Sequence, residues 1–311
     1  MAVNDLRLSR IIAVANGKGG VGKTTLSTNL AGLHASTGRR TLLIEFDPQG
    51  DCGLDLGYGY DDLGDGGAHM LAALKGEQPL QPVLRDVRPN LDVIPMGRGA
   101  LLEIEDLLNS AARQGAPFRH LLRETLLPLA DQYDLVVVDT PPFAPVVLQL
   151  VLSTSRWLVI PTRGDNASLL GLRELAAEID EARPSNPDLE LLGIVLFDMD
   201  TAATRIRREA EKSVGQLLGV TSDRLLDRTI RHSAAALDAR GHGCLVHELA
   251  QMAAAERPHL FEALRAGLKV TRIPGSVVQL EHDFRAITHT LVARMTASES
   301  RELGVTMGRS A

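Results

Sequence analysis

The residues from Asn16 to Thr25 have the side chains and the spacing of a phosphate-binding loop. They read Asn-Gly-Lys-Gly-Gly-Val-Gly-Lys-Thr-Thr and match the pattern G-x-x-x-x-G-K-[ST] at every required position. Glycines let the backbone turn tightly enough to aim several N–H groups at one anion, at the positive end of the helix that follows. Lys23 is then expected to reach the β- and γ-phosphates of a nucleoside triphosphate, and the Thr24 hydroxyl to join the coordination of Mg²⁺. The residues of the loop expected to bind nucleotide are Gly17, Gly19, Gly20, Val21, Gly22, Lys23, Thr24 and Thr25.

The segments on either side of this loop are those that such a site requires. Residues 10–15 form a short apolar run typical of a buried strand, and leucines recur at helical spacing over 26–33 until Gly38 ends the pattern. Lys18 places a second lysine on the same short loop. The alternative is a glycine turn with a solvated lysine, but the order strand, loop and helix favours a nucleotide site.

Two aspartates follow other apolar runs of the kind that covered parallel strands need. Asp47 comes after residues 42–46, and Asp139 comes after residues 135–138. The carboxyl ends of parallel strands meet at one edge of a sheet, so both carboxylates are expected near the glycine loop, where they can hold Mg²⁺. The alternative for each aspartate is that it only caps a loop.

The chain as a whole indicates a doubly wound α/β fold with a mostly parallel sheet and helices on both faces. It has 311 residues, of which 44% are hydrophobic and 3% aromatic, so it can bury a large aliphatic core. We expect one domain over 1–311, with a helical part over 251–295 and a flexible tail over 296–311. Strands are expected at about 10–16, 41–46, 91–96, 135–140, 157–162, 191–198 and 225–230.

Three spaced segments resemble the deviant Walker A ATPases of the ParA/MinD family, and most of all the small ParA/Soj-type partition ATPases. The first is Lys-Gly-Gly-Val-Gly-Lys-Thr-Thr at 18–25, and the second is the strand at 41–50, which ends in Asp-Pro-Gln-Gly. The third, at 133–142, is similar to the Walker B strand and second switch of the family. The resemblance implies a P-loop NTPase of the SIMIBI-like type that binds ATP and Mg²⁺ and hydrolyses ATP to ADP and phosphate.

The resemblance also implies roles for individual residues. The lysine that matches Lys18 reaches across an ATP-bound homodimer to the phosphates of the partner subunit. Asp47 belongs to the first switch, and Pro141 to a second switch that senses the γ-phosphate. The implied catalytic residues are Lys18, Lys23, Asp47 and Asp139, and the implied metal-binding residues are Thr24, Asp47 and Asp139.

Two positions depart from the pattern of the family. Glu45 stands where partition ATPases usually carry aspartate, which is one methylene shorter. The segment 230–246 keeps the spacing of the base-binding loop, with Asp238 in place but Arg231 where a proline is expected. The resemblance assigns Arg231 and Asp238 to nucleotide binding and implies adenine as the base.

The charge pattern bears on a nucleic-acid partner. A net charge of −6 and a pI of about 5.9 give the chain no bulk attraction to DNA, but arginines crowd one helical stretch. Two subunits together could engage about six to ten phosphates and so bind nonspecific DNA. The alternative is an ordinary solvated face, because Glu209 and Glu211 lie among these arginines. The candidate DNA-binding residues are Arg205, Arg207, Arg208 and Arg228.

The remaining features narrow the location and the partners. Cys52 and Cys244 are the only cysteines, which does not favour a zinc or iron–sulfur site held within one chain. The sequence has neither an apolar run of membrane-spanning length nor a basic amphipathic tail, so we expect a cytoplasmic protein that does not bind membranes. The expected DNA binding would make it nucleoid-associated. The resemblance implies that a ParB-like protein stimulates the ATPase during plasmid or chromosome segregation. Positioning of a protein cargo, and an ATP-switched assembly protein without DNA binding, remain alternatives.

Overall fold

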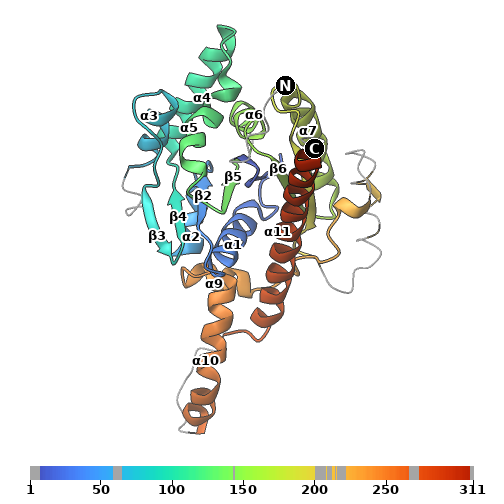
Figure 1. The fold of residues 1–311 in the computed structure, drawn as a ribbon. Helices are drawn as coiled ribbons and strands as arrows, with labels where there is room; N and C mark the ends of the chain where they lie inside the picture. Colours follow the sequence, from blue (N-terminus) through green and yellow to red (C-terminus); the bar gives the residue numbers. More distant parts are fainter. Residues whose placement is uncertain are drawn as a thin grey trace.

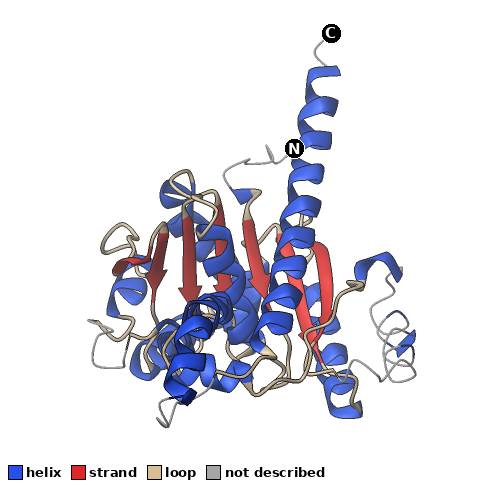
Figure 2. Ribbon diagram, turned by 90° about the horizontal axis from the view of Figure 1, so that it is seen from below, coloured by secondary structure: helices blue, strands red, loops and turns tan. Residues whose placement is uncertain are grey.

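One sheet runs through the middle of the molecule, and helices cover both of its faces (Figure 1, Figure 2). The structure is a computed structural model that describes residues 8–58, 65–142, 144–199, 208, 212–213, 215, 222–265 and 273–308. This arrangement confirms the expected α/β fold with a doubly wound, mostly parallel sheet.

The described sheet has seven strands in the order β3-β4-β2-β5-β1-β6-β7. All neighbouring strands are parallel except β3 and β4, which are antiparallel. Strand β1 is therefore near the centre, between β5 and β6. The strands are β1 (Ile11–Val14), β2 (Thr41–Glu45), β3 (Leu84–Arg88), β4 (Leu91–Ile94), β5 (Leu135–Asp139), β6 (Trp157–Thr162) and β7 (Glu190–Leu196).

The helices lie in two layers, one on each face of the sheet. The described α-helices are α1 (Lys23–Ala35), α2 (Asp51–Leu56), α3 (Ala68–Leu74), α4 (Arg98–Arg113), α5 (Leu121–Ala130), α6 (Pro145–Leu152), α7 (Asn166–Ala182), α9 (Ala235–Gly241), α10 (Val246–Arg265) and α11 (Val277–Gly308). Two short 3₁₀ helices are η3 (Phe118–His120) and η4 (Ser222–Arg224).

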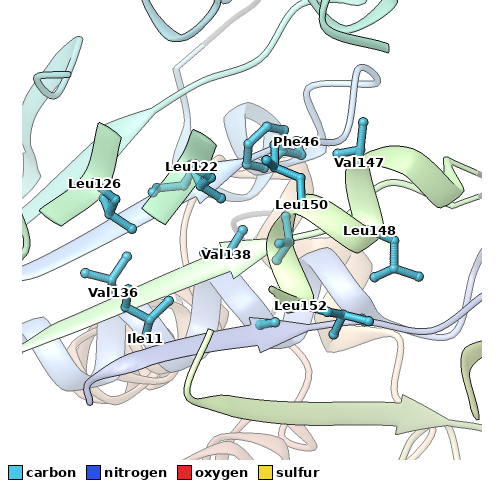
Figure 3. Packing of buried hydrophobic residues seen from close by; sticks show 14 of the residues in the cluster. Ile11, Phe46, Leu122, Leu126, Val136, Val138, Val147, Leu148, Leu150 and Leu152 are labelled. Atoms are coloured by element: carbon cyan, nitrogen blue, oxygen red, sulfur yellow. The ribbon is translucent and has the colours of Figure 1, made fainter. Parts of the chain in front are cut away.

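Alternate residues of the central strands enter two separate cores, as the two-residue period of a strand requires. Ile11 and Ala13 of β1 pack into the core beneath α3 to α7, whereas Ile12 and Val14 pack into the core beneath α1 and α9 to α11. Figure 3 shows the first of these cores, where side chains of β1 and β5 face those of α5 and α6. Each fully buried aliphatic side chain contributes about 1.5–3 kcal/mol to this packing. The strand ends that carry the glycine loop are therefore held from both sides.

The edges of the sheet differ from the expectation. Strand β3 was not expected, because its sequence Leu-Arg-Asp-Val-Arg is mostly charged; it forms through a hairpin at Pro89 and Asn90, with Asn90 at φ 66°. Proline followed by a residue with positive φ is typical of a type II turn. The expected strand over 225–230 is wrong, because this segment pairs with the other edge through isolated bridges, from Leu225 to Ile194 and from Arg231 to Met199, and not through a continuous ladder.

The C-terminal helix is longer than expected. Helix α11 continues unbroken from Val277 to Gly308, across the boundary at 296 where a tail was expected. The side chains of Ser9 and Arg10 donate to the Glu299 carboxylate at 3.0 and 2.9 Å. These contacts tie the segment beyond residue 296 to the body of the protein, which the sequence pattern of α11 alone does not reveal.

No helix in the described ranges has both the length and the apolar composition that crossing a membrane requires.

Candidate nucleotide-binding site

The strand register brings the predicted motifs to one edge of the sheet. Asp139, the last residue of β5, is paired with Val14 of β1 on one side and with Glu45 of β2 on the other. The glycine loop leaves β1 directly after Val14, and Asp47 follows β2 by two residues. The structure therefore brings the loop and both predicted carboxylates together at the carboxyl ends of neighbouring strands, where ligands of open α/β sheets bind.

The loop needs glycine for its backbone shape and for its close packing. Gly20 and Gly22 adopt left-handed conformations, with φ values of 71° and 93°, which side chains disfavour. A Cβ atom on Gly22 would come within 2.7 Å of the Phe197 ring. Helix α1 begins one residue later, at Lys23, so its unpaired N–H groups face the loop.

Lys23 is buried at the centre of the loop. Its side chain donates to the carbonyl oxygen of Lys18 at 3.1 Å. Burial lowers the pKa of Lys23 below its usual value, while the carboxylates of Asp139 and Asp47 oppose this shift. An ammonium group has three donors. Lys23 can therefore bind an anion in the loop while keeping its bond to the backbone.

Asp139 is fully buried and is held by two hydroxyl groups of α1. Thr24 Oγ1 donates to Oδ2 at 2.8 Å, and Ser27 Oγ donates to Oδ1 at 2.9 Å. Burial raises the pKa of Asp139 from 3.8 to about 7, against the opposing effects of both hydroxyl groups and of Lys23. Because Thr24 uses its proton for Asp139, the hydroxyl oxygen keeps lone pairs for a cation. This hydroxyl–carboxylate pair has the oxygen donors with which a Mg²⁺ ion bound to phosphate could be held.

Glu45 and Asp47 come from the end of β2, which neighbours β5 on the side away from β1. Asp47 is 7% exposed and accepts a hydrogen bond from the backbone N–H of Gln49 at 2.9 Å. Burial raises its pKa, and the Gln49 N–H and Lys23 oppose this rise. Glu45 is completely buried and accepts from the backbone N–H of Cys52 at 3.0 Å. Its longer side chain is therefore directed into the protein, and this burial raises the pKa of Glu45 to about 8.

Lys18 lies in the loop, but its ammonium is directed toward α7. Nζ donates to Asp165 Oδ1 at 2.9 Å and to Ser168 Oγ at 3.3 Å. Its backbone N–H donates to Asn16 Oδ1 at 2.9 Å. The Lys18 side chain is 30% exposed, so this lysine remains accessible at the surface, whereas Lys23 does not.

Pro141 lines a hollow beside the loop. This cavity of about 360 Å³ extends from the loop residues Asn16 and Gly17 to helices α6 and α7. Its wall is largely apolar, with two carboxylates from α7. The lining residues are Asn16, Gly17, Pro141, Ala144, Pro145, Leu148, Glu174, Leu175 and Glu178.

The segment assigned to the base is anchored at both ends. Arg231 donates through Nε and Nη2 to the carboxylate of Asp283 on α11, at 2.5 and 3.0 Å. Asp238 lies in the first turn of α9, where its carbonyl oxygen is 2.7 Å from Nδ1 of His242. Arg240, near the end of α9, forms an ion pair at 2.7 Å with the buried carboxylate of Asp55, on the helix that follows the first switch. The segment expected to bind the base and helix α2 are thereby linked.

The candidate DNA-binding arginines are only partly described. Arg205 and Arg207 lie outside the described residues. Arg208 is exposed, and the Arg228 side chain is 56% exposed at 3.7 Å from Asp283. A surface cavity of about 380 Å³ lies beside Arg228, lined by Leu226, Asp227, Arg228, Thr229, Arg231, Asp283, Thr290 and Arg294.

Some residues that contact the candidate site were not found from the sequence. Ser27 follows Thr24 by one helical turn, so a search for polar residues on the same helix face could have found its bond to Asp139. Asp165 and Ser168 have the spacing of an N-cap at the start of α7, and Ser168 N–H does donate to Asp165 Oδ1 at 2.8 Å. Their contact with Lys18, however, joins distant parts of the chain, so no local sequence pattern predicts it.

A phosphate-binding loop that follows a central strand of a doubly wound sheet places the chain in the class of P-loop NTPases. A family model described as an AAA domain matches residues 9–191. The chromosome partitioning protein ParA of Myxococcus xanthus is 34% identical over 228 residues, which cover 73% of this chain and 78% of that protein. Together with the deviant Walker A loop, these similarities show that the chain belongs to the ParA/MinD family.

Two solved structures share the fold. A complex of a McdA variant from Cyanothece with ATP has a TM-score of 0.68 at 19% identity, covering 91% of this chain and 96% of that one. Cobyrinic acid a,c-diamide synthase from Mycobacterium smegmatis, with a bound ATP analogue and magnesium, has a TM-score of 0.61 at 25% identity and covers 85% and 99%.

Proposed function

We propose that the protein is a ParA-type ATPase that pairs with a second copy of itself when it binds MgATP, then binds nonspecific DNA, and releases both on hydrolysis. A ParB-like partner stimulates hydrolysis, and the cycle segregates plasmid or chromosomal DNA on the nucleoid. The observation that carries this proposal is the contrast between the two loop lysines. Lys23 is buried and bonded to the carbonyl oxygen of Lys18 in its own loop, whereas the Lys18 side chain is partly exposed at the surface.

The residues at the sheet edge fit MgATP. The glycine loop offers backbone N–H groups, and Lys23 has donors left for the β- and γ-phosphates. Among the described residues, no three His, Cys, Asp or Glu side chains are grouped so that they could hold a metal by themselves. Mg²⁺ usually keeps several waters and takes phosphate oxygens, so Thr24, with Asp139 and Asp47 behind it, suits that incomplete ligand set. When bound, Mg²⁺ neutralises charge on the β- and γ-phosphates.

The chemistry left to the protein is positioning and electrostatic stabilisation. Lys23 stabilises the charge of the transferred phosphoryl group from its own subunit, and Lys18 does so for the pocket of the partner. Asp47, at the start of the first switch, orients the attacking water and the metal shell. Pro141 keeps the second switch stiff where it meets the γ-phosphate.

DNA binding draws its support from two exposed arginines. Arg208 and Arg228 are both accessible to solvent, and two subunits double their number. If each protomer contributes these two arginines, four phosphates are contacted, and the logarithm of the binding constant should fall with a slope of about −4 against the logarithm of salt concentration. A single subunit should have only half of that slope.

Co-sedimentation with nonspecific DNA over a salt series tests this function. With ATP we expect binding with a steep salt slope, and with ADP little binding. Absence of binding in both nucleotide states would remove DNA from the proposal and leave an ATP-switched assembly protein.

Two variants of the loop complete the experiment. Lys18→Ala should still bind nucleotide but neither pair nor hydrolyse ATP, whereas Lys23→Ala should lose nucleotide binding as well. Full turnover by Lys18→Ala would contradict the role of Lys18 at the partner's phosphates.

A further inference from the structure

Helix α7 holds the Lys18 side chain of its own subunit. The ammonium donates to Asp165 Oδ1 at 2.9 Å and to Ser168 Oγ at 3.3 Å, and both acceptors belong to the start of α7. Hydrogen bonds from Lys18 and Ser168 outweigh the effect of burial and hold the pKa of Asp165 below its usual value. In this conformation, the Lys18 side chain therefore binds to its own subunit.

We propose that Asp165 and Ser168 form a holding site that competes with the partner's ATP for Lys18, and so set how readily two subunits pair. This inference rests on the proposed function, because it assumes that Lys18 acts on the partner's phosphates. It assigns positioning roles to two residues outside the phosphate-binding loop and the switches.

The acceptor side of this contact is fixed. Asp165 Oδ1 also accepts the backbone N–H of Ser168 at 2.8 Å and thereby caps α7. Ser168 itself is completely buried. Asp165 is consequently tied to the start of the helix and cannot follow Lys18 to a partner subunit.

The backbone of Lys18 is fixed as well. Asn16 accepts its N–H at 2.9 Å and donates to the carbonyl oxygen of Pro161 at 2.8 Å. Gly171 of α7 packs so closely that a Cβ there would lie 2.9 Å from Lys18 N and 3.0 Å from Lys18 Cβ. With the backbone held, only the flexible lysine side chain can exchange between Asp165 and a new anion.

The strength of the contact suits a regulated exchange. The side chains of Lys18 and Asp165 are 30% and 47% exposed, so solvent and salt weaken their ion pair. One ion pair of this kind favours the held position of the Lys18 side chain over the released position by about 1.4- to 5-fold. Pairing of two subunits breaks two such contacts, so the two together raise the dimer dissociation constant by about 2- to 30-fold.

Asp165→Asn separates the ionic contact from the helix cap. Asparagine caps helices about as well as aspartate, so α7 should keep its start while the charge that holds Lys18 is lost. We would measure the dimer dissociation constant by analytical ultracentrifugation with a non-hydrolysable ATP analogue at low salt. The expected result is a constant about 2- to 30-fold lower than that of the wild type. Ser168→Ala should shift the constant in the same direction by a smaller factor.

Asp180→Asn is the matched control, because it removes the same charge from the same helix. The Asp180 side chain is 80% exposed and pairs with Arg183, and this variant should dimerise as the wild type does. A salt series provides a second readout: the gap between Asp165→Asn and the wild type should narrow as salt screens the ion pair. A change in the fold alone would leave a gap that salt does not close.

The outcomes separate this inference from the proposed function. If the wild type pairs with the analogue but Asp165→Asn pairs equally well or less well, the holding site is refuted and the ATPase cycle stands. If the gap persists at high salt, an ionic hold on Lys18 is likewise refuted. If the wild type does not pair at all, the proposed function fails, and the holding site fails with it.

Discussion

Replacing Asp139 with asparagine should make the nucleotide-free protein more stable at alkaline pH while abolishing its activity. Asp139 is completely buried, and its pKa is raised from 3.8 to about 7. Above neutral pH the folded protein therefore carries a buried charge that the unfolded chain exposes to water. About three pKa units at 1.4 kcal/mol each correspond to a cost of about 4 kcal/mol at pH 8.

Asparagine recovers most of this free energy, because it fits the same place. Its Nδ2 group can donate to Ser27 Oγ, since that hydroxyl lies 3.0 Å from the carbonyl oxygen of Lys23 and can donate there instead. One imperfect hydrogen bond costs about 1–2 kcal/mol, so the net gain at pH 8 should be about 2–3 kcal/mol. The wild type loses stability as pH rises from 3.8 to 7, so at pH 5 the cost of burying Asp139 is less than half of that at pH 8, and the two proteins should be nearly equal in stability.

Chemical denaturation of nucleotide-free protein at pH 5 and pH 8 measures this difference, and phosphate release measures the activity. Without the carboxylate behind Thr24, the variant should hydrolyse ATP at least about 100-fold more slowly and lose the thermal stabilisation by MgATP. The reasoning is refuted if Asp139→Asn is less stable than the wild type at pH 8, or if the same gain appears at pH 5.

Three further predictions address other parts of the structure. Gly22→Ala combines a left-handed backbone with a clash against Phe197, so it should destabilise the protein by about 3 kcal/mol in urea denaturation, and an unchanged midpoint would contradict the packing described. Burial lowers the pKa of His34 to about 4, so the wild type should lose up to about 3 kcal/mol of stability as pH falls from 6.5 to 4. His34→Gln should keep this stability, and an equal loss in both proteins would argue against His34 as the cause. Arg240→Ala leaves the buried carboxylate of Asp55 without its charged partner, with the Thr28 hydroxyl still donating to it at 2.9 Å. The variant should lose about 3 kcal/mol or more of stability and bind nucleotide more weakly, whereas a loss below about 1 kcal/mol would show that the ion pair is unimportant.

The parts of this protein that could be predicted from its sequence are those with local signals. The glycine loop, the strands that carry Asp47 and Asp139, and their meeting at one edge all follow from motif spacing and from the geometry of parallel sheets. The apolar run of β5 suits a strand covered on both faces, because such a strand is apolar and β-branched along its whole length.

The features that escaped prediction depend on contacts between distant segments. Strand β3 is a charged edge strand that its neighbour β4 stabilises through a hairpin, and residues 225–230 fail to form a strand because only parts of their backbone reach β7. The preference of Lys18 for Asp165 joins the first loop of the chain to a helix far along the sequence. The direction of the Glu45 side chain could not be predicted from the sequence either. A longer side chain at this position can point toward a ligand or, as it does here, into the core.

Mixing two inactive variants tests most directly whether Lys18 serves the partner's pocket. Lys18→Ala keeps an intact pocket but has no lysine to offer, whereas Lys23→Ala has a damaged pocket but still offers Lys18. In a mixed dimer, the pocket of the Lys18→Ala subunit receives Lys18 from its partner. Neither variant should pair with itself, so the dimers that form are mixed, each with one working pocket, and turnover should rise clearly above the sum of the two variants, to at most about half of the wild-type rate. Turnover no higher than the sum of the separate variants would contradict the account.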